Sequence, residues 1–139
     1  MQATPPNRQR AAGLTAYCSR HRFHAALITH DANHGRVCQI VSCPEDWPGE
    51  GLNFGAWVAL LDGPVRLEVR VAGSGQQVFR SAGDAPQAIG PVLNASLISD
   101  EGGRGEHVSF TGAFVGMLAY DLTGKIWTAD FPSFDYAPA

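Results

Sequence analysis

The sequence predicts an all-β protein in which antiparallel strands build a sandwich or a barrel. Short segments rich in β-branched and aromatic residues recur along the chain, with turn signals roughly every 8–12 residues, the spacing expected of such folds. The 139 residues include 16 glycines and 9 prolines, which favour turns over long helices. No segment shows the apolar stripe of a helix, with its period of about 3.6 residues.

The first strands are predicted to form a β-meander behind a disordered lead-in. The lead-in covers residues 1–10, which are polar and include two prolines; the sandwich domain then covers 11–137. A strand at 12–18 is followed, after a basic turn, by a second strand at 23–31. The turn "DANHG" separates that strand from a third at 35–43.

A loop and the clearest strand of the chain come next. Residues 44–55 hold two prolines and three glycines, which exclude a strand through most of the segment. A short strand is predicted at 56–61. In 65–73 apolar and charged residues alternate, so one face of the strand is predicted to be buried and the other wet. The apolar face carries Val65, Leu67, Val69 and Val71, and the other face Arg66, Glu68 and Arg70.

The second half of the chain is less regular. A strand is predicted at 76–81, after the turn "GSG", and residues 82–92 are predicted to be irregular. The segment 93–103 is predicted to be mostly loop, with room for a short helical turn. The last two predicted strands are a long one at 107–121 and one at 127–136 that is broken by a proline, which lacks a backbone N–H.

Composition and charge argue against several classes of protein. The formal net charge is −3, lysine occurs once and no run of basic residues is present, so no nucleic-acid partner is expected. No apolar run reaches the roughly 18 residues of a membrane span, and the first residues lack the apolar core of a signal peptide. Three cysteines, an odd number, fit free thiols in a reducing cytoplasm; a Cys38–Cys43 pair is the alternative.

No complete active site can be identified from the residues. Four histidines lie within fourteen residues, and His24 and His30 share a strand face, but no CxxC or HxxxH pair gives the spacing typical of zinc, so no metal site is expected. No two carboxylates stand out as the facing pair that a glycosidase needs. No phosphate loop, dinucleotide fingerprint or G-x-S-x-G motif is present, so no cofactor is expected.

Aromatic residues are the remaining candidates for ligand contact. Trp47, Phe54 and Trp57 flank the loop at 44–55, and aromatic rings in clefts commonly hold the apolar faces of sugars. Local packing is the alternative role for these three rings.

The stretch "SFTGAFVGMLAYDLTG" (109–124) carries two further rings. Phe110 and Phe114 share a strand face with Gly112 and Gly116. A glycine within a strand often marks a bulge or the close approach of another chain or ligand, so one ring could pack on a neighbouring backbone while the other leaves the core. The residues alone favour burial of both rings.

Longer segments resemble one family. "FTGAFVGMLAYDLTGKIWTADFPSFDY" (110–136) is similar to the C-terminal signature of the β-xylosidases of glycoside hydrolase family 43. Three upstream segments resemble those of the family in the same order: "AAGLTAYCSRHRFHAALITHDANHGRVCQIVSC", "GPVRLEVRV" and "IGPVLNASLISDE". The resemblance spans about residues 10–136, nearly the whole chain.

The resemblance implies a fold and a partner. Members of the family have a five-bladed catalytic propeller followed by a concanavalin A-like β-sandwich of the jelly-roll type, and this chain is expected to be that antiparallel sandwich. The family's catalytic carboxylates lie in the propeller, so no residue of this chain is expected to be catalytic. The family's sandwich begins some tens of residues earlier, which implies that this one lacks its first strands and is incomplete. "ADFPSF" (129–134) also departs from the family's "ADFDYF".

The resemblance also implies a site. In the family, a loop of the sandwich closes one side of a shallow sugar pocket. The phenylalanine that opens "FTGAF" is Phe110, which is therefore expected to reach the substrate, with Thr111 and Gly112 shaping its loop. Phe114 is then expected to be the core ring.

The implied function is that of a non-catalytic accessory module in xylan degradation. The module would pack on the propeller of a β-xylosidase or α-L-arabinofuranosidase and help to close its pocket around xylo-oligosaccharide or arabinoxylan fragments. A free-standing carbohydrate-binding module for xylo-oligosaccharides is one alternative. A truncated remnant or split subunit is another; it would expose sheet edges and apolar surface, and could form a homo-oligomer.

Overall fold

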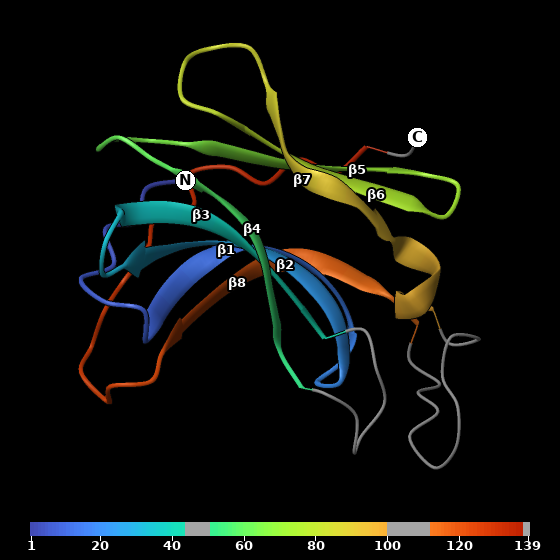
Figure 1. The fold of residues 1–139 in the computed structure, drawn as a ribbon, viewed down its shortest axis with the longest axis horizontal. Coiled ribbons are helices and arrows are strands. Elements are labelled where there is room, and N and C mark those ends of the chain that lie inside the picture. The colour runs from blue at the N-terminus through green and yellow to red at the C-terminus, as the bar shows by residue number, and fades with distance from the viewer. Residues whose placement is uncertain (44–50, 100–111, 138–139) are drawn as a thin grey trace.

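Two antiparallel β-sheets pack face to face in the computed structural model, which describes residues 1–43, 51–99 and 112–137 (Figure 1). The larger sheet has five strands in the order β4-β3-β2-β1-β8, and the smaller has three in the order β5-β6-β7. This arrangement confirms the predicted antiparallel sandwich. The strands are β1 (Arg10–Ser19), β2 (Arg22–Asp31), β3 (Gly35–Cys43), β4 (Asn53–Ala59), β5 (Arg66–Ala72), β6 (Gly75–Ser81), β7 (Gln87–Asn94) and β8 (Phe114–Asp121).

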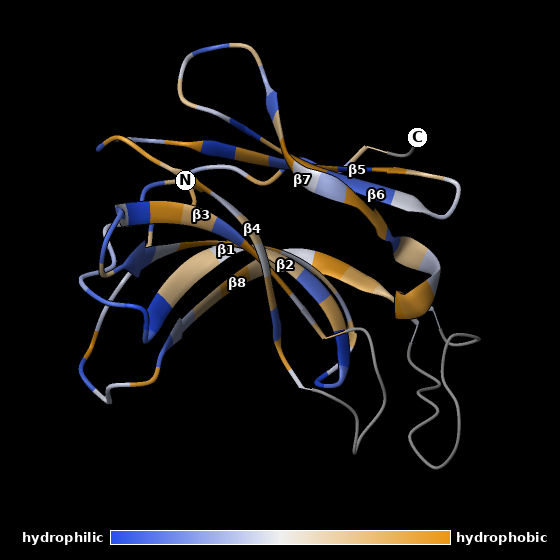
Figure 2. Ribbon diagram, viewed as in Figure 1, coloured by the Kyte–Doolittle hydropathy of each residue, from blue (hydrophilic) through white to orange (hydrophobic). Residues whose placement is uncertain are grey.

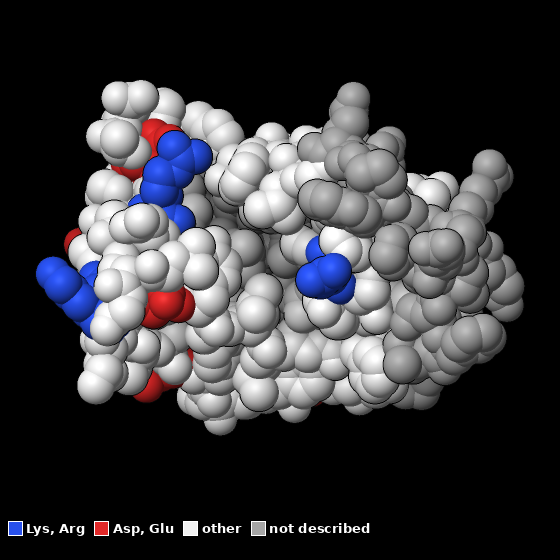
Figure 3. Space-filling model, turned by 90° about the horizontal axis from the view of Figure 1, so that it is seen from below, with Lys and Arg blue, Asp and Glu red and all other residues white. Residues whose placement is uncertain are grey.

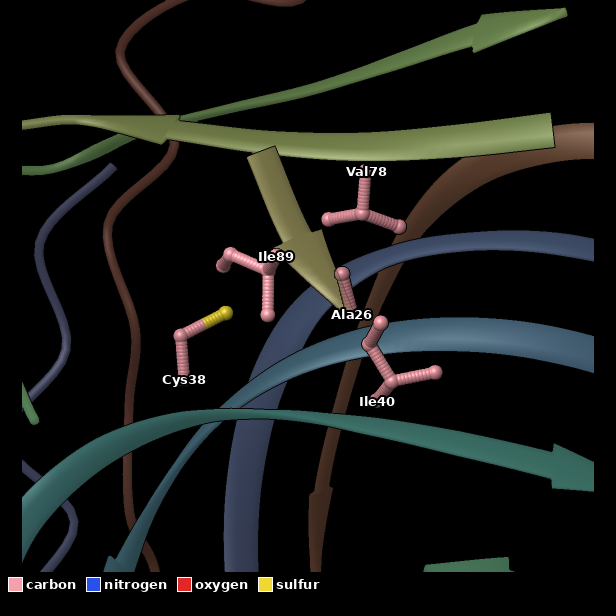
Figure 4. Close-up of a cluster of buried hydrophobic side chains, with 5 residues drawn as sticks. All are labelled: Ala26, Cys38, Ile40, Val78 and Ile89. Atoms are coloured by element: carbon pink, nitrogen blue, oxygen red, sulfur yellow. The ribbon is translucent and has the colours of Figure 1, made fainter. Parts of the chain in front are cut away.

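The main core lies between the two sheets. Because side chains alternate along a strand, the even-numbered residues of β2 and β3 face the smaller sheet. Ala26, Cys38 and Ile40 there meet Val78 of β6 and Ile89 of β7, and all five are almost fully buried (Figure 4). A second cluster, which joins β1 and β2 to the start of β5, is formed by Ala3, Ala12, Ile28 and Val65.

Hydropathy follows the same arrangement. Apolar residues are concentrated in the strands, and hydrophilic ones in the turns at their ends (Figure 2). The three cysteines are buried thiols that no disulfide joins, so Cys38 and Cys43 do not pair. Burial raises the pKa of the Cys38 thiol to about 12, which leaves it protonated at neutral pH. Within the described ranges, no helix is long and apolar enough to cross a membrane.

The structure differs from the sequence prediction in the second half of the chain. Strand β7 covers 87–92, predicted to be irregular, and 93–94, predicted to lie in a loop; its pairing with β6 accommodates a shift of register between Gln76 and Val78. The short helical turn is confirmed as the 3₁₀ helix η1 (Ala95–Ile98). Residues 127–136 form no strand, and Asp130 alone makes an isolated bridge, to Gln2. The strand predicted at 107–121 begins at Phe114, with 107–111 outside the described residues.

The N-terminal residues also differ from the predicted disordered lead-in. Ala3 is 2 % exposed and belongs to the second core cluster. Arg36 donates from Nε to the carbonyl oxygen of Ala3 over 2.8 Å, and the backbone of Met1 exchanges hydrogen bonds with Val65. A polar, proline-bearing sequence therefore lies along the sandwich because the fold supplies it with backbone partners.

Candidate functional site

The predicted site residues fall into two groups. Phe110, Thr111 and Trp47 lie outside the described residues, whereas Gly112, Phe54 and Trp57 lie within them. The described residues on either side of 100–111 form the base of that segment. The candidate site is therefore built from this base and from the face of the larger sheet beside it.

The residues that lead into 100–111 are held by both layers of the sandwich. The side chain of Asn94 accepts a hydrogen bond from the backbone N–H of Ser96 and caps η1. Ile98, at the end of η1, is buried against Ala16 and Cys18 of β1. Arg22, which is 1 % exposed, donates from Nη1 to the carbonyl oxygen of Ser99 over 2.9 Å. These contacts fix the chain up to the last described residue before the segment.

A buried histidine links the two layers at the same place. His24 of β2 is 3 % exposed; its Nε2 lies 3.2 Å from the carbonyl oxygen of Asn94, and its Nδ1 lies 2.8 Å from Ser42 Oγ. Since a carbonyl can only accept, Nε2 carries the proton and the neutral ring accepts from the Ser42 hydroxyl. Burial lowers the pKa of His24, and the hydrogen bond to Asn94 offsets this only in part.

We expect His24 to make the stability of the domain depend on pH. Its pKa in the folded protein is lower than the ordinary value of 6.5, so below about pH 6.5 the unfolded chain binds more protons than the folded one. The free energy of unfolding should therefore fall as the pH drops below about 6.5, and level off below the folded-state pKa. Urea denaturation at a series of pH values would measure this, and His24→Gln should flatten the slope over that window. An unchanged slope in His24→Gln would contradict the assignment.

The residues that follow 100–111 lead into strand β8 of the larger sheet. Gly112 has a φ of +71°, a left-handed conformation that glycine adopts without the steric cost of a side chain. Two residues later β8 begins, with Phe114 directly opposite Tyr17 of β1. The predicted role of Gly112 in shaping the loop and its relation to a sugar both stay predictions.

Phe114 is not the core ring that the resemblance implies. It is 58 % exposed, because the register of β8 on β1 points its even-numbered residues away from the smaller sheet. Phe114 instead continues a row across the open face, beside Tyr17 and then Phe23, whose ring centroid lies 6.1 Å from that of Tyr17. Tyr17 and Phe23 were not among the predicted site residues, although their places in predicted strands gave their parity.

The open face of the larger sheet is hollowed. Seen from below, it carries most of its visible acidic and basic groups at one end, and a further basic group lies near the middle of the view (Figure 3). Next to the aromatic row, the strand pairings align a row of small residues, namely Ala25, Thr15 and Gly116. A floor of small side chains beside aromatic rings can accept a flat, partly apolar group.

Phe54 and Trp57 lie on β4, at the opposite edge of this sheet from β8. They are 54 % and 45 % exposed, and the ring centroid of Trp57 lies 4.2 Å from that of His34. Three strands separate β4 from β8, so the structure does not bring Phe54 and Trp57 together with Gly112 or Phe114. Among the described residues, no cluster of three His, Cys, Asp or Glu side chains could hold a metal ion.

These features define the class of the protein as a concanavalin A-like β-sandwich with an open, hollowed face. The chain belongs to the family of C-terminal concanavalin A-like domains of β-xylosidases, whose model matches residues 1–137. This family match confirms the resemblance seen in the sequence.

Individual relatives agree with the family. The chain is 36% identical over 140 residues to a xylosidase/arabinosidase 43B of Humicola insolens, covering 97% of this chain and 26% of that protein. It is 34% identical over 128 residues to a xylan 1,3-beta-xylosidase of a Vibrio species, covering 90% of this chain and 23% of that protein. The solved structure of a xylan beta-1,4-xylosidase from Bacillus halodurans C-125 superposes on this chain with a TM-score of 0.77 at 26% identity. The match covers 88% of this chain and 23% of that one. The chain thus spans about a quarter of the length of the relatives it matches.

Proposed function

We propose that the chain is a non-catalytic accessory module of a family 43 glycoside hydrolase. It would pack on a catalytic propeller and help to close a sugar pocket of the β-xylosidase or α-L-arabinofuranosidase type. The observation that carries the proposal is that a family of C-terminal domains matches residues 1–137, whereas the full-length relatives are about four times as long as this chain.

The base of segment 100–111 supports a positioning role for that segment. Arg22, His24 and Ile98 fix the chain where the segment begins, and Gly112 and the pairing of β8 fix it where the segment ends. Fixed flanking residues restrict the positions that the residues between them can take, which favours binding. We propose Phe110 as the ring that this segment carries into the sugar pocket, with Thr111 and Gly112 shaping its turn.

A reconstitution assay tests this function. The catalytic part of a longer relative, ending before the matched segment, is assayed on an aryl β-xyloside with and without the 139-residue chain. We expect the chain alone to be inactive and to raise the activity of the catalytic part, and Phe110→Ala to lose most of that gain, with an effect of about tenfold or more. Phe54→Ala, an exposed ring on the opposite edge, is the matched control. Turnover by the pure chain that persists through purification would refute the proposal.

The exposed rings of β4 favour a second candidate function. Phe54 and Trp57 are both about half exposed on one edge strand, and such rings suit a carbohydrate-binding module for xylo-oligosaccharides, to which Trp47 could also contribute. Titration of xylo-oligosaccharides against tryptophan fluorescence separates the two functions. A saturable shift that is lost in Trp57→Ala would favour the binding module, and no shift would favour the accessory module.

A further inference from the structure

The edge strands of the two sheets are not equally protected against pairing with another chain. They are β4 and β8 in the larger sheet and β5 and β7 in the smaller. Proteins protect such edges with charged residues, prolines or bulges. β5 carries three charged residues, β7 contains Pro91, and the pairing of β4 with β3 shifts in register between Gln39 and Val41.

β8, which the structure describes over its whole length, lacks these protections. It pairs with β1 over eight consecutive positions without a shift of register. Its sequence, FVGMLAYD, contains no proline and one charged residue, Asp121. The Asp121 carboxylate lies 3.1 Å from Nε of Arg10 on β1, so a partner within the chain offsets its charge. β8 is therefore a regular and nearly uncharged edge, the kind that pairs readily with another strand.

The backbone groups on the free edge of β8 belong to its odd-numbered residues. The N–H of Leu122 donates to the carbonyl oxygen of Gln9 over 2.9 Å, which continues the ladder between β8 and β1. Because these groups point to opposite sides at alternate residues, the even-numbered residues of β8 bond to β1. The N–H and C=O groups of Val115, Met117 and Ala119 consequently point away from β1, and no described strand pairs with them.

Apolar side chains are accessible on both faces of β8. Val115 and Met117, on the side of the smaller sheet, are each 49 % exposed. Phe114, on the open face, is 58 % exposed. A second strand added to this edge would therefore bury apolar area on both faces of the sheet.

β8 is complementary to a second copy of itself. In an antiparallel pair, residues whose backbone groups point outward must lie opposite residues of the same kind, and a twofold axis at Met117 meets this condition. The opposed residues are then Met117 with Met117, Val115 with Ala119, Phe114 with Tyr120, and Gly116 with Leu118. Each unlike pair joins two aromatic rings or a larger with a smaller apolar residue, and the two methionines are flexible enough to pack on each other.

Charge and overlap favour this register over its neighbours. With the axis at Met117, Asp121 lies opposite Ala113, beyond the end of β8, and keeps its ion pair with Arg10. An axis at Leu118 would place the Asp121 carboxylate opposite Val115 within the ladder. An axis at Gly116 would pair only residues 114–118 of the strand.

We propose that two copies of this chain pair through their β8 edges about a twofold axis at Met117, which joins their two five-stranded sheets into one continuous sheet. The partner is a second copy because β8 complements its own sequence in this register. The contact is also closed, since each copy uses the same edge and the pair offers no further edge of this kind. The proposal stands on the residues of β8 and does not depend on the proposed function.

The oligomeric state of the whole chain tests the pairing. Sedimentation velocity from about 1 µM to about 1 mM should show a species of twice 14.8 kDa that increases with concentration. Met117→Lys should weaken the dimer about tenfold or more, because two like charges would face each other at the axis. Met117→Glu should do the same, and an equimolar mixture of the two variants should restore the dimer. Val92→Lys, at an exposed site on β7, is the matched control and should dimerise like the unchanged chain.

Three results would overturn the proposal. The first is an unchanged chain that stays monomeric across this range. The second is a dimer that persists undiminished in Met117→Lys, and the third is a mixture of the two charged variants that stays monomeric.

Amide exchange identifies the surface that the dimer uses. The amides of Val115, Met117 and Ala119 should exchange about tenfold or more slowly at high than at low concentration. Those of Gly116 and Leu118, which bond to β1, should be protected at every concentration and show that each variant is folded. A dimer without this alternation would use another surface and would contradict the proposal. Either outcome leaves the reconstitution assay of the proposed function unaffected.

Discussion

Gly13→Ala should unfold the domain or cost about 4 kcal/mol or more of stability, among the largest effects expected of a single substitution. A Cβ on Gly13 would lie 1.8 Å from the carbonyl oxygen of Ala26 and 2.9 Å from its carbon. Both atoms belong to the backbone of β2, which pairs with β1 at this point, so no side chain can move aside to make room. Denaturant unfolding followed by circular dichroism would measure the loss.

Gly116→Ala is the matched control for this prediction. Gly116 lies on the neighbouring strand β8, opposite Thr15, and a Cβ there would meet nothing within 4 Å. Its stability should change by less than about 1 kcal/mol. Equal losses in the two variants would show that the close approach of β1 and β2 at Gly13 is not what requires glycine.

Arg36→Met should cost about 2–4 kcal/mol. The Arg36 side chain is 9 % exposed and donates to the carbonyl oxygens of Ala3 and Leu61, which belong to two separate segments. Burial lowers the pKa of Arg36, with the nearby carboxylate of Asp62 acting against this. Methionine keeps most of the volume but leaves both carbonyls without their donor.

The loss should be local to the segments that Arg36 joins. Amide exchange of Val65, whose N–H donates to Met1, should accelerate in Arg36→Met, because the N-terminal residues lose their anchor. Arg66→Met, at an exposed arginine on β5, should change stability by less than about 0.5 kcal/mol. A similar loss in both variants would assign the effect to charge rather than to the buried hydrogen bonds.

The sequence predicted the strands whose side chains alternate or whose turns carry strong local signals. β2 and β3 were recognised closely for this reason, and the alternation of 65–73 correctly placed Val65 in the core. Val71, predicted for the same buried face, is 42 % exposed. Alternation gives the side on which a residue lies, but it cannot show whether another layer covers that side.

The errors arose where pairing depends on distant residues. β7 contains Gly90, with a φ of +63°, and Pro91, both of which weaken a local strand signal, yet β6 supplies it with a partner. The segment 127–136 has a good local signal and almost no partner. For the candidate site, parity gave the strand faces of Phe114 and Tyr17, but their position opposite each other depends on the register of β8 on β1, which joins residues about 100 positions apart. The roles of Arg22 and His24 depend on contacts with residues more than 65 positions away, which local sequence patterns do not report.

The pairing of β1 with β8 has a consequence for how the protein is made. Leu14 and Met117, which lie opposite each other, are about 100 positions apart in the sequence. During synthesis on the ribosome, the edge of β1 that pairs with β8 therefore stays unpaired while the rest of the sandwich is made. Strand β8 can pair with it only when nearly the whole chain has emerged. Such long-range closure slows folding and exposes a pairing edge to other chains in the meantime. Aggregation of nascent chains should be most sensitive to changes in β8 that delay its docking.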